Sequence, residues 1–101
     1  MAIGVADSDS KRQTLRIRNK LGLHARAAVK FVQLASRFEA EVKVVKDGQE
    51  ANGKSIMGLL TLVAACGMQI EVVTAGPDAH EALVALAELV GRGFDEGIEH
   101  A

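Results

Sequence analysis

The sequence predicts an α+β fold: one open-faced, two-layer sandwich in which three helices cover one face of a four-stranded antiparallel sheet. Residues 14–18 and 41–46 alternate polar and apolar side chains, which is typical of half-buried strands. Asp47-Gly48 follows directly and favours the tight turn of a β-hairpin. After His24, apolar residues recur at helical spacing. The predicted order is β-α-β-β-α-β-α, with the last strand between the first two.

The first strand, 14–18, should place Leu15 and Ile17 toward the core. A loop over 19–23, loosened by Gly22, leads into a helix from about Ala25 to Arg37. The apolar positions that define this helix are Ala28, Phe31, Val32 and Ala35.

The hairpin returns through 49–52, and Ser55 is the expected N-cap of a second helix over 56–65. That helix carries too many large apolar residues for one buried stripe. We expect an inward stripe of Leu59, Leu62 and Val63. A second set is then left exposed for a partner: Ile56, Met57 and Leu60.

The last strand is expected over 69–75, and Asp78 with Glu81 has the spacing of a capping box for the last helix. The apolar stripe of that helix is Leu83, Leu86, Ala87 and Val90. We therefore expect one domain over 13–95, between a flexible N-terminal tail, 1–12, and a frayed C-terminal tail, 96–101.

Composition excludes several classes of protein. The chain has 101 residues and a formal net charge of −1, which argues against a general nucleic-acid binder. No apolar run approaches the ~18–20 residues that span a bilayer, and no secretory signal is visible. We therefore expect a cytoplasmic protein without a membrane partner. Cys66 is the single cysteine, so neither a disulfide nor a cysteine-based metal site is expected, and we predict that it fills the core.

His24 is the leading candidate for chemistry because it lies at or just before the start of the first helix. Backbone N–H groups there lack helical partners and the helix dipole is positive, so the position attracts phosphate. Neutral imidazole is also a nucleophile and could carry a phosphoryl group covalently. The competing interpretation is an exposed histidine without function. We interpret His80 and His100 as solvated, and the three are not spaced as metal ligands.

Two further residues have both a functional and a structural interpretation. Arg26 is close enough to His24 to stabilise added negative charge, or it is simply a solvated helix residue. Ser55 either caps the second helix or is a regulatory site. No nucleotide-binding loop of the form G-x-x-x-x-G-K-[ST] is present, so a phosphoryl group would have to come from another protein.

Three motifs resemble the family of histidine-containing phosphocarrier proteins, HPr, of the bacterial phosphotransferase system. They are Asn-Lys-Leu-Gly-Leu-His-Ala-Arg over 19–26, Gly-Lys-Ser-Ile-Met-Gly-Leu over 53–59, and Ile-Glu-Val at 70–72 followed by Gly-Pro at 76–77. The resemblance covers about 14–94 and implies the HPr-like sandwich already predicted from the pattern. It further implies a phosphoryl carrier with a phosphohistidine intermediate, rather than an enzyme with its own small-molecule substrate.

By this resemblance, His24 accepts a phosphoryl group on Nδ1 from phospho-enzyme I and passes it to a histidine of an enzyme IIA. Arg26 matches the arginine beside the active histidine, and Ser55 matches the serine that an HPr kinase modifies in some bacteria. We expect a monomer that needs no cofactor or metal. The residues that we expect to contact partners are Leu23, Ala25, Ala27, Val29, Ile56, Met57 and Leu60.

Two features leave alternatives open. Ala27 stands where the family motif usually has proline, and we expect transfer to survive this change because alanine keeps good helix propensity. The motifs at 19–22 and 93–96 resemble the nitrogen-related paralogue NPr, whereas 54–57 resembles the sugar-transport form. The alternative functions are a regulatory binding module controlled through Ser55, and a small hydrolase or transferase acting through His24, which the absence of a second acid/base group disfavours.

Overall fold

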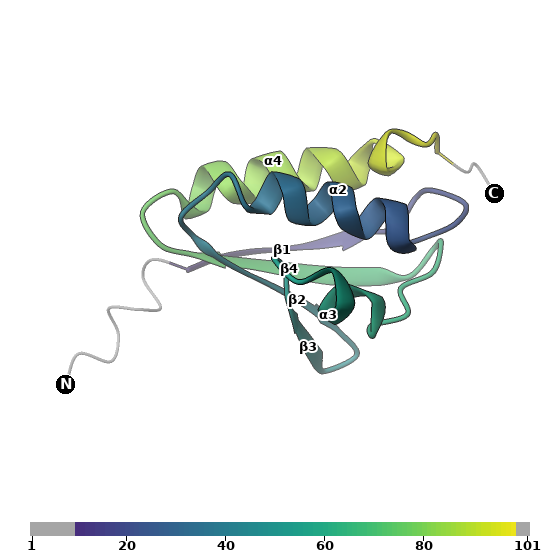
Figure 1. The fold of residues 1–101 in the computed structure, drawn as a ribbon, viewed down its shortest axis with the longest axis horizontal. Helices are drawn as coiled ribbons and strands as arrows, with labels where there is room; N and C mark the ends of the chain where they lie inside the picture. Colours follow the sequence, from purple (N-terminus) through teal and green to yellow (C-terminus); the bar gives the residue numbers. More distant parts are fainter. Residues whose placement is uncertain (1–9, 99–101) are drawn as a thin grey trace.

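A computed structural model describes residues 10–98 of the chain. It contains a four-stranded antiparallel sheet in the order β1-β4-β2-β3, with three α-helices, so the fold predicted from the sequence is confirmed (Figure 1). The fourth strand lies between the first two, an arrangement that satisfies the connection rules. The elements are β1 (Ser10–Arg16), α2 (Ala25–Ala35), β2 (Glu41–Lys46), β3 (Gln49–Asn52), α3 (Ile56–Leu60), β4 (Gln69–Ala75), α4 (Ala79–Gly91) and the 3-10 turn η1 (Gly93–Asp95).

The core lies between the sheet and its helices. β4 pairs with β2 so that Val72 lies opposite Val44, and both side chains are fully buried. Phe31 of α2 is only 1% exposed. Helices α2 and α4 contact each other side by side over the sheet, while α3 contacts α2 and β3 (Figure 1). Alternation along the strands therefore sends one face to the helices and leaves the other to solvent.

The first strand begins earlier than expected. Ser10 already pairs with Ala75, so residues 10–12, which were expected in the N-terminal tail, belong to β1. Residues 1–9 of the expected tail lie outside the described residues. Ile17 is fully buried beyond the end of β1, and its N–H donates to the carbonyl of Met68 at 2.8 Å. The expected orientation of Ile17 is correct, whereas Leu15 is only half-buried.

Helix α3 is shorter than the predicted helix over 56–65. Its end tightens through i→i−3 bonds, in which Leu62 N–H donates to Leu59 and Val63 N–H donates to Leu60. Val63 then adopts φ 51°, and its side chain is 72% exposed. The prediction that Val63 lines the core is therefore wrong, because the left-handed backbone turns it outward and Ala64 is buried instead. Cys66 follows in the same exposed loop, so its predicted burial is also wrong.

Asp78 begins α4, but its side chain makes no capping hydrogen bond. Its carboxylate instead accepts the backbone N–H groups of Glu39 at 3.0 Å and Ala40 at 2.8 Å. These bonds, with a smaller contribution from Lys54, lower the pKa of Asp78 in spite of partial desolvation. In place of the predicted capping box, two hydrogen bonds connect the start of α4 to the segment before β2. The buried stripe of α4 also includes Ala82 and Leu89, whereas Ala87 is only half-buried.

Residues 10–98 contain neither a membrane-spanning helix nor a cluster of metal-ligating side chains. No helix there has the length and apolar character needed to cross a membrane. No group of three or more histidine, cysteine or acidic side chains in this range is arranged to hold a metal ion.

Candidate functional site

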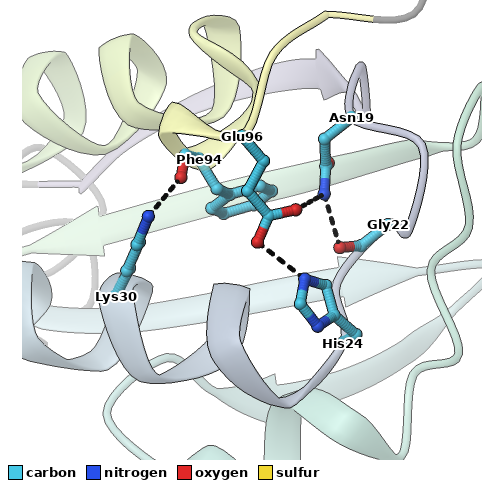
Figure 2. A network of polar contacts seen from close by, with 6 residues as sticks. All are labelled: Asn19, Gly22, His24, Lys30, Phe94 and Glu96. Atoms are coloured by element: carbon cyan, nitrogen blue, oxygen red, sulfur yellow. Dashed lines mark hydrogen bonds and ion pairs between the residues drawn. The ribbon is translucent and has the colours of Figure 1, made fainter.

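His24 is the N-cap residue of α2, as the sequence predicted. Its backbone is extended, with φ −84° and ψ −177°, and its carbonyl accepts the N–H of Ala28 at 2.8 Å. The imidazole does not cap the helix. It is free to point away from the helix end, and it reaches across to the C-terminal segment (Figure 2).

The partner of His24 is Glu96, 72 positions later in the chain. Nε2 of His24 lies 2.7 Å from Oε2 of Glu96, and the two side chains are 26% and 15% exposed. The other oxygen of Glu96 accepts a hydrogen bond from Nδ2 of Asn19 at 2.9 Å. Nδ2 also donates to the carbonyl of Gly22 at 2.9 Å. Figure 2 shows Asn19, Glu96 and His24 joined in this order at the start of α2.

Glu96 is held in its charged form. Burial raises the pKa of its carboxyl, but hydrogen bonds from Asn19 and His24 and the nearby positive charge of Lys30 outweigh this, so the pKa is below its usual value. The hydrogen bonds of Glu96 therefore stabilise the fold at pH values above the usual carboxyl pKa. This contribution is lost as the pH falls through the lowered pKa. A carboxylate only accepts hydrogen bonds, so the neutral imidazole carries its proton on Nε2 and its lone pair on Nδ1.

The C-terminal turn brings Glu96 to this place. Phe94 is fully buried and has a left-handed backbone, φ 54°, which reverses the chain directly after α4. Its carbonyl accepts a hydrogen bond from Nζ of Lys30, on α2, at 2.8 Å. Asp95, beside it, pairs with Arg92 at 2.8 Å and not with His24. The turn is thus anchored by one buried ring and one contact to α2.

The loop before His24 is fixed from the other side. The N–H of Leu23 donates to the carbonyl of Ala64 at 2.8 Å. Gly22 has φ +68°, and a Cβ there would lie 2.5 Å from the same carbonyl oxygen. Only glycine suits this position, because it tolerates both the left-handed backbone and the close approach.

Some of the residues expected to contact partners are accessible in the structure, and two are buried. Leu23 is 5% exposed and Ala27 is 0% exposed, so neither side chain is available to a partner and that expectation is wrong for both. Both side chains belong to the hydrophobic core, Leu23 from the loop before α2 and Ala27 from its first turn. The remaining residues range from exposed to half-buried: Ala25, Val29, Ile56, Met57 and Leu60.

Arg26 and Ser55 occupy the places that the sequence indicated. Arg26 is exposed in the first turn of α2, and its side chain forms no hydrogen bond or ion pair with another residue of the range 10–98. Ser55 is the N-cap of α3, and its Oγ accepts the N–H of Gly58 at 3.0 Å. The neighbouring Lys54 donates to the carbonyl of Phe38 at 2.7 Å. His80 is exposed, as expected, and His100 lies outside the described residues.

Asn19 and Glu96 are the site residues that sequence reasoning missed. They are 77 positions apart, and no local period connects them. The sequence places Glu96 in a frayed tail, yet its side chain is only 15% exposed and lies against His24. The available signal was the pair of motifs at 19–22 and 93–96, which were interpreted only as a mark of the paralogue.

The His24 side chain is partly accessible from the surface, with 26% of it exposed. A groove of about 610 Å³ is lined mainly by β2, β3 and β4, and His24 is not among its residues.

Comparison with known proteins gives one consistent result. A family model described as the phosphorylation site of the HPr component of the phosphotransferase system matches residues 11–92. The phosphocarrier protein HPr of Neisseria meningitidis is 54% identical over 86 residues, 85% of this chain and 97% of its own length. The phosphocarrier protein NPr of Escherichia coli is 49% identical over 84% of this chain and 96% of its own. A crystal structure of HPr from Thermoanaerobacter tengcongensis superposes with a TM-score of 0.84 at 42% identity, covering 87% of this chain and 99% of the other.

Proposed function

Because the chain belongs to the HPr family and so has the role of a phosphocarrier in the phosphotransferase system, we propose that His24 is the residue that carries the phosphoryl group. It accepts this group from phospho-enzyme I, which is charged by phosphoenolpyruvate, and passes it to a histidine of an enzyme IIA. The carrier acts as a monomer in the cytoplasm, without a cofactor.

The observation that carries this proposal is the orientation of the His24 ring. Nε2 is occupied by Glu96, so Nδ1 is the nitrogen with a free lone pair. In the accepting step, this pair forms a bond to phosphorus while the bond from phosphorus to the donor atom of enzyme I breaks and its electron pair stays on the donor. In the second step, the Nδ1–phosphorus bond breaks in the same manner as the histidine of enzyme IIA attacks.

Positive charge around His24 supports the same role. The first turn of α2 contains no acidic residue, and its free N–H groups lie directly after the N-cap. Arg26 has no competing partner in the described part of the chain, so its guanidinium is available to the phosphoryl oxygens. Ala27, which replaces the usual proline, adds one more N–H to this turn.

The proposed partner surface consists of the exposed residues beside His24: Ala25, Ile56 and Met57, with Val29 and Leu60 at its margins. Helices α2 and α3 contact each other, which supports the view that one partner covers both groups. Met57 is 70% exposed and Ile56 is 37% exposed. Exposed methionine suits a surface that must accept two different proteins in turn.

The direct test is incubation with phosphoenolpyruvate and enzyme I. The wild-type protein should gain one acid-labile, base-stable phosphoryl group. His24→Ala should gain none and should still fold, with a lower melting temperature because Glu96 loses one of its hydrogen bonds. The matched control is His80→Ala, which removes an exposed histidine from α4 and should leave phosphorylation unchanged. Phosphorylation of His24→Ala would contradict the proposal.

Regulation through Ser55 is a second function that one observation favours. Ser55 begins the helix that carries Ile56 and Met57, so a charge added there lies at the edge of the proposed partner surface. A serine kinase acting on it would alter binding without rebuilding the core. The regulatory interpretation thus complements the carrier function.

A further inference from the structure

Asn19 is a buried polar residue whose two donated hydrogen bonds both serve the His24 site. It is 0% exposed, and its Nδ2 donates to Gly22 and to Glu96. Its Oδ1 is buried without a partner among residues 10–98. Reversing the amide would not remedy this, because both neighbours are acceptors and need the NH₂ group. The amide is therefore fixed in one orientation, at the cost of one unsatisfied oxygen.

We propose that Glu96, anchored by Asn19, is a positioning residue for phosphoryl transfer that keeps the proton on Nε2 of His24 throughout the cycle. This inference rests on the proposed function of His24. The inference depends on two linked hydrogen bonds (Figure 2). Nδ2 of Asn19 lies 2.9 Å from Oε1 of Glu96, and Nε2 of His24 lies 2.7 Å from Oε2 of the same carboxylate.

The proton on Nε2 matters in both steps. Before transfer, it fixes the tautomer in which Nδ1 is the nucleophile. Once the Nδ1–phosphorus bond forms, the ring with its Nε2 proton is positively charged, and the carboxylate stabilises this form. When that bond breaks, the electron pair stays on Nδ1 and the ring departs as neutral imidazole. If Nε2 had lost its proton, the ring would have to depart as an anion, which is a much poorer leaving group.

No other carboxylate of residues 10–98 is placed to hold the Nε2 proton of His24. Glu96 is the only carboxylate paired with His24 among residues 10–98, since Asp95 pairs with Arg92. Lys30, on α2, acts on Glu96 and favours its charged form. Residues 55–65, which include α3, contain no titratable side chain. On the remaining sides the exposed cations are Lys20, in the loop before His24, and Arg26.

The test replaces Glu96 by Gln, which keeps the shape but removes the charge. Two quantities are measured on protein labelled with ¹⁵N in its imidazole rings: the tautomer of unphosphorylated His24 and the pH at which Nε2 titrates in the phosphorylated protein. We expect Glu96→Gln to raise the Nδ1–H fraction, lower the midpoint by about one pH unit, and reduce transfer to enzyme IIA about tenfold near neutral pH. Asp95→Asn is the matched control, because it removes the neighbouring carboxylate that does not face His24.

Three outcomes are decisive. Unchanged tautomer, midpoint and rate in Glu96→Gln overturn the inference. A slower transfer with unchanged tautomer and midpoint also overturns it, because a merely structural role would give that pattern. If the wild-type protein is not phosphorylated at His24, the proposed function fails, and the tautomer measurement still decides whether Glu96 sets the Nε2 proton. Asn19→Ala should change the midpoint in the same direction as Glu96→Gln, by a smaller amount.

Discussion

Nζ of Lys30 donates a hydrogen bond to the carbonyl of Phe94 at 2.8 Å, so α2 holds the turn that carries Glu96 at a second point besides His24. The contact lies between one helix near the start of the chain and the last described turn. It explains how a residue beyond the last long helix can be placed with the accuracy that the proposed phosphoryl transfer needs.

Lys30→Met tests this contact, because it keeps the apolar stem and removes the donor. We expect the free energy of unfolding to fall by about 1 kcal/mol, the usual worth of such a hydrogen bond. The matched control is Lys43→Met on β2, whose ammonium pairs with Glu50 at the surface and should contribute less than about 0.5 kcal/mol. Equal stability of the two variants in urea denaturation would show that the Lys30 contact does not anchor the turn.

Met57→Glu tests the partner surface. The side chain is 70% exposed, so we expect an unchanged melting temperature and at least tenfold weaker binding to enzyme I in titration calorimetry. Val84→Glu is the matched control: Val84 is 43% exposed on α4, outside the proposed surface, and should leave binding unchanged. If both variants bind enzyme I as the wild type does, Met57 lies outside the interface.

Ser55 gives a prediction in which stability and function separate. Aspartate is as good an N-cap as serine, so Ser55→Asp should melt at the wild-type temperature or slightly above it. Its charge beside Ile56 and Met57 should nevertheless slow phosphorylation of His24 by enzyme I. Ser55→Ala is the complement: it should cost about 1 kcal/mol in stability and leave the rate unchanged. A normal rate in Ser55→Asp would rule out the regulatory interpretation.

Val63 gives a prediction about backbone strain. It is a β-branched residue with φ 51° and a largely exposed side chain, so it loses little packing when replaced. Asparagine tolerates this conformation better, and Val63→Asn should raise the free energy of unfolding by about 1 kcal/mol. Val84→Asn on α4 should give no such gain, since valine and asparagine have similar helix propensities. A lower melting temperature for Val63→Asn would mean that the valine side chain packs after all.

The features that the sequence predicted well are local ones. The start of α2 at His24, the hairpin at Asp47-Gly48 and the N-cap at Ser55 depend on residues within a few positions, and the structure has all three. The predicted strand order was one that satisfies the general connection rules, and the structure has it.

The features that the sequence did not predict depend on contacts between distant segments. The apolar run 56–65 looked like one helix, but a left-handed residue at Val63 ends it and turns the chain toward Cys66 and β4. Asp78 had the spacing of a cap, but the loop at Glu39 and Ala40 offered two backbone donors instead. Neither competitor is visible in a local pattern.

The same reason explains the missing half of the site. His24 could be found because a helix start and a histidine are neighbours in sequence. Glu96 could not, because its place depends on the backbone of Phe94, the contact from Lys30 and the amide of Asn19, which come from three separate segments.

The most direct measurement of the central claim is to identify the ring nitrogen that carries phosphorus. The protein is labelled with ¹⁵N in its imidazole rings, phosphorylated with phosphoenolpyruvate and enzyme I, and examined by ¹⁵N–³¹P coupling in NMR spectra. The geometry at Glu96 predicts phosphorus on Nδ1 of His24, with the proton retained on Nε2. Phosphorus on Nε2, or on any residue other than His24, would contradict it.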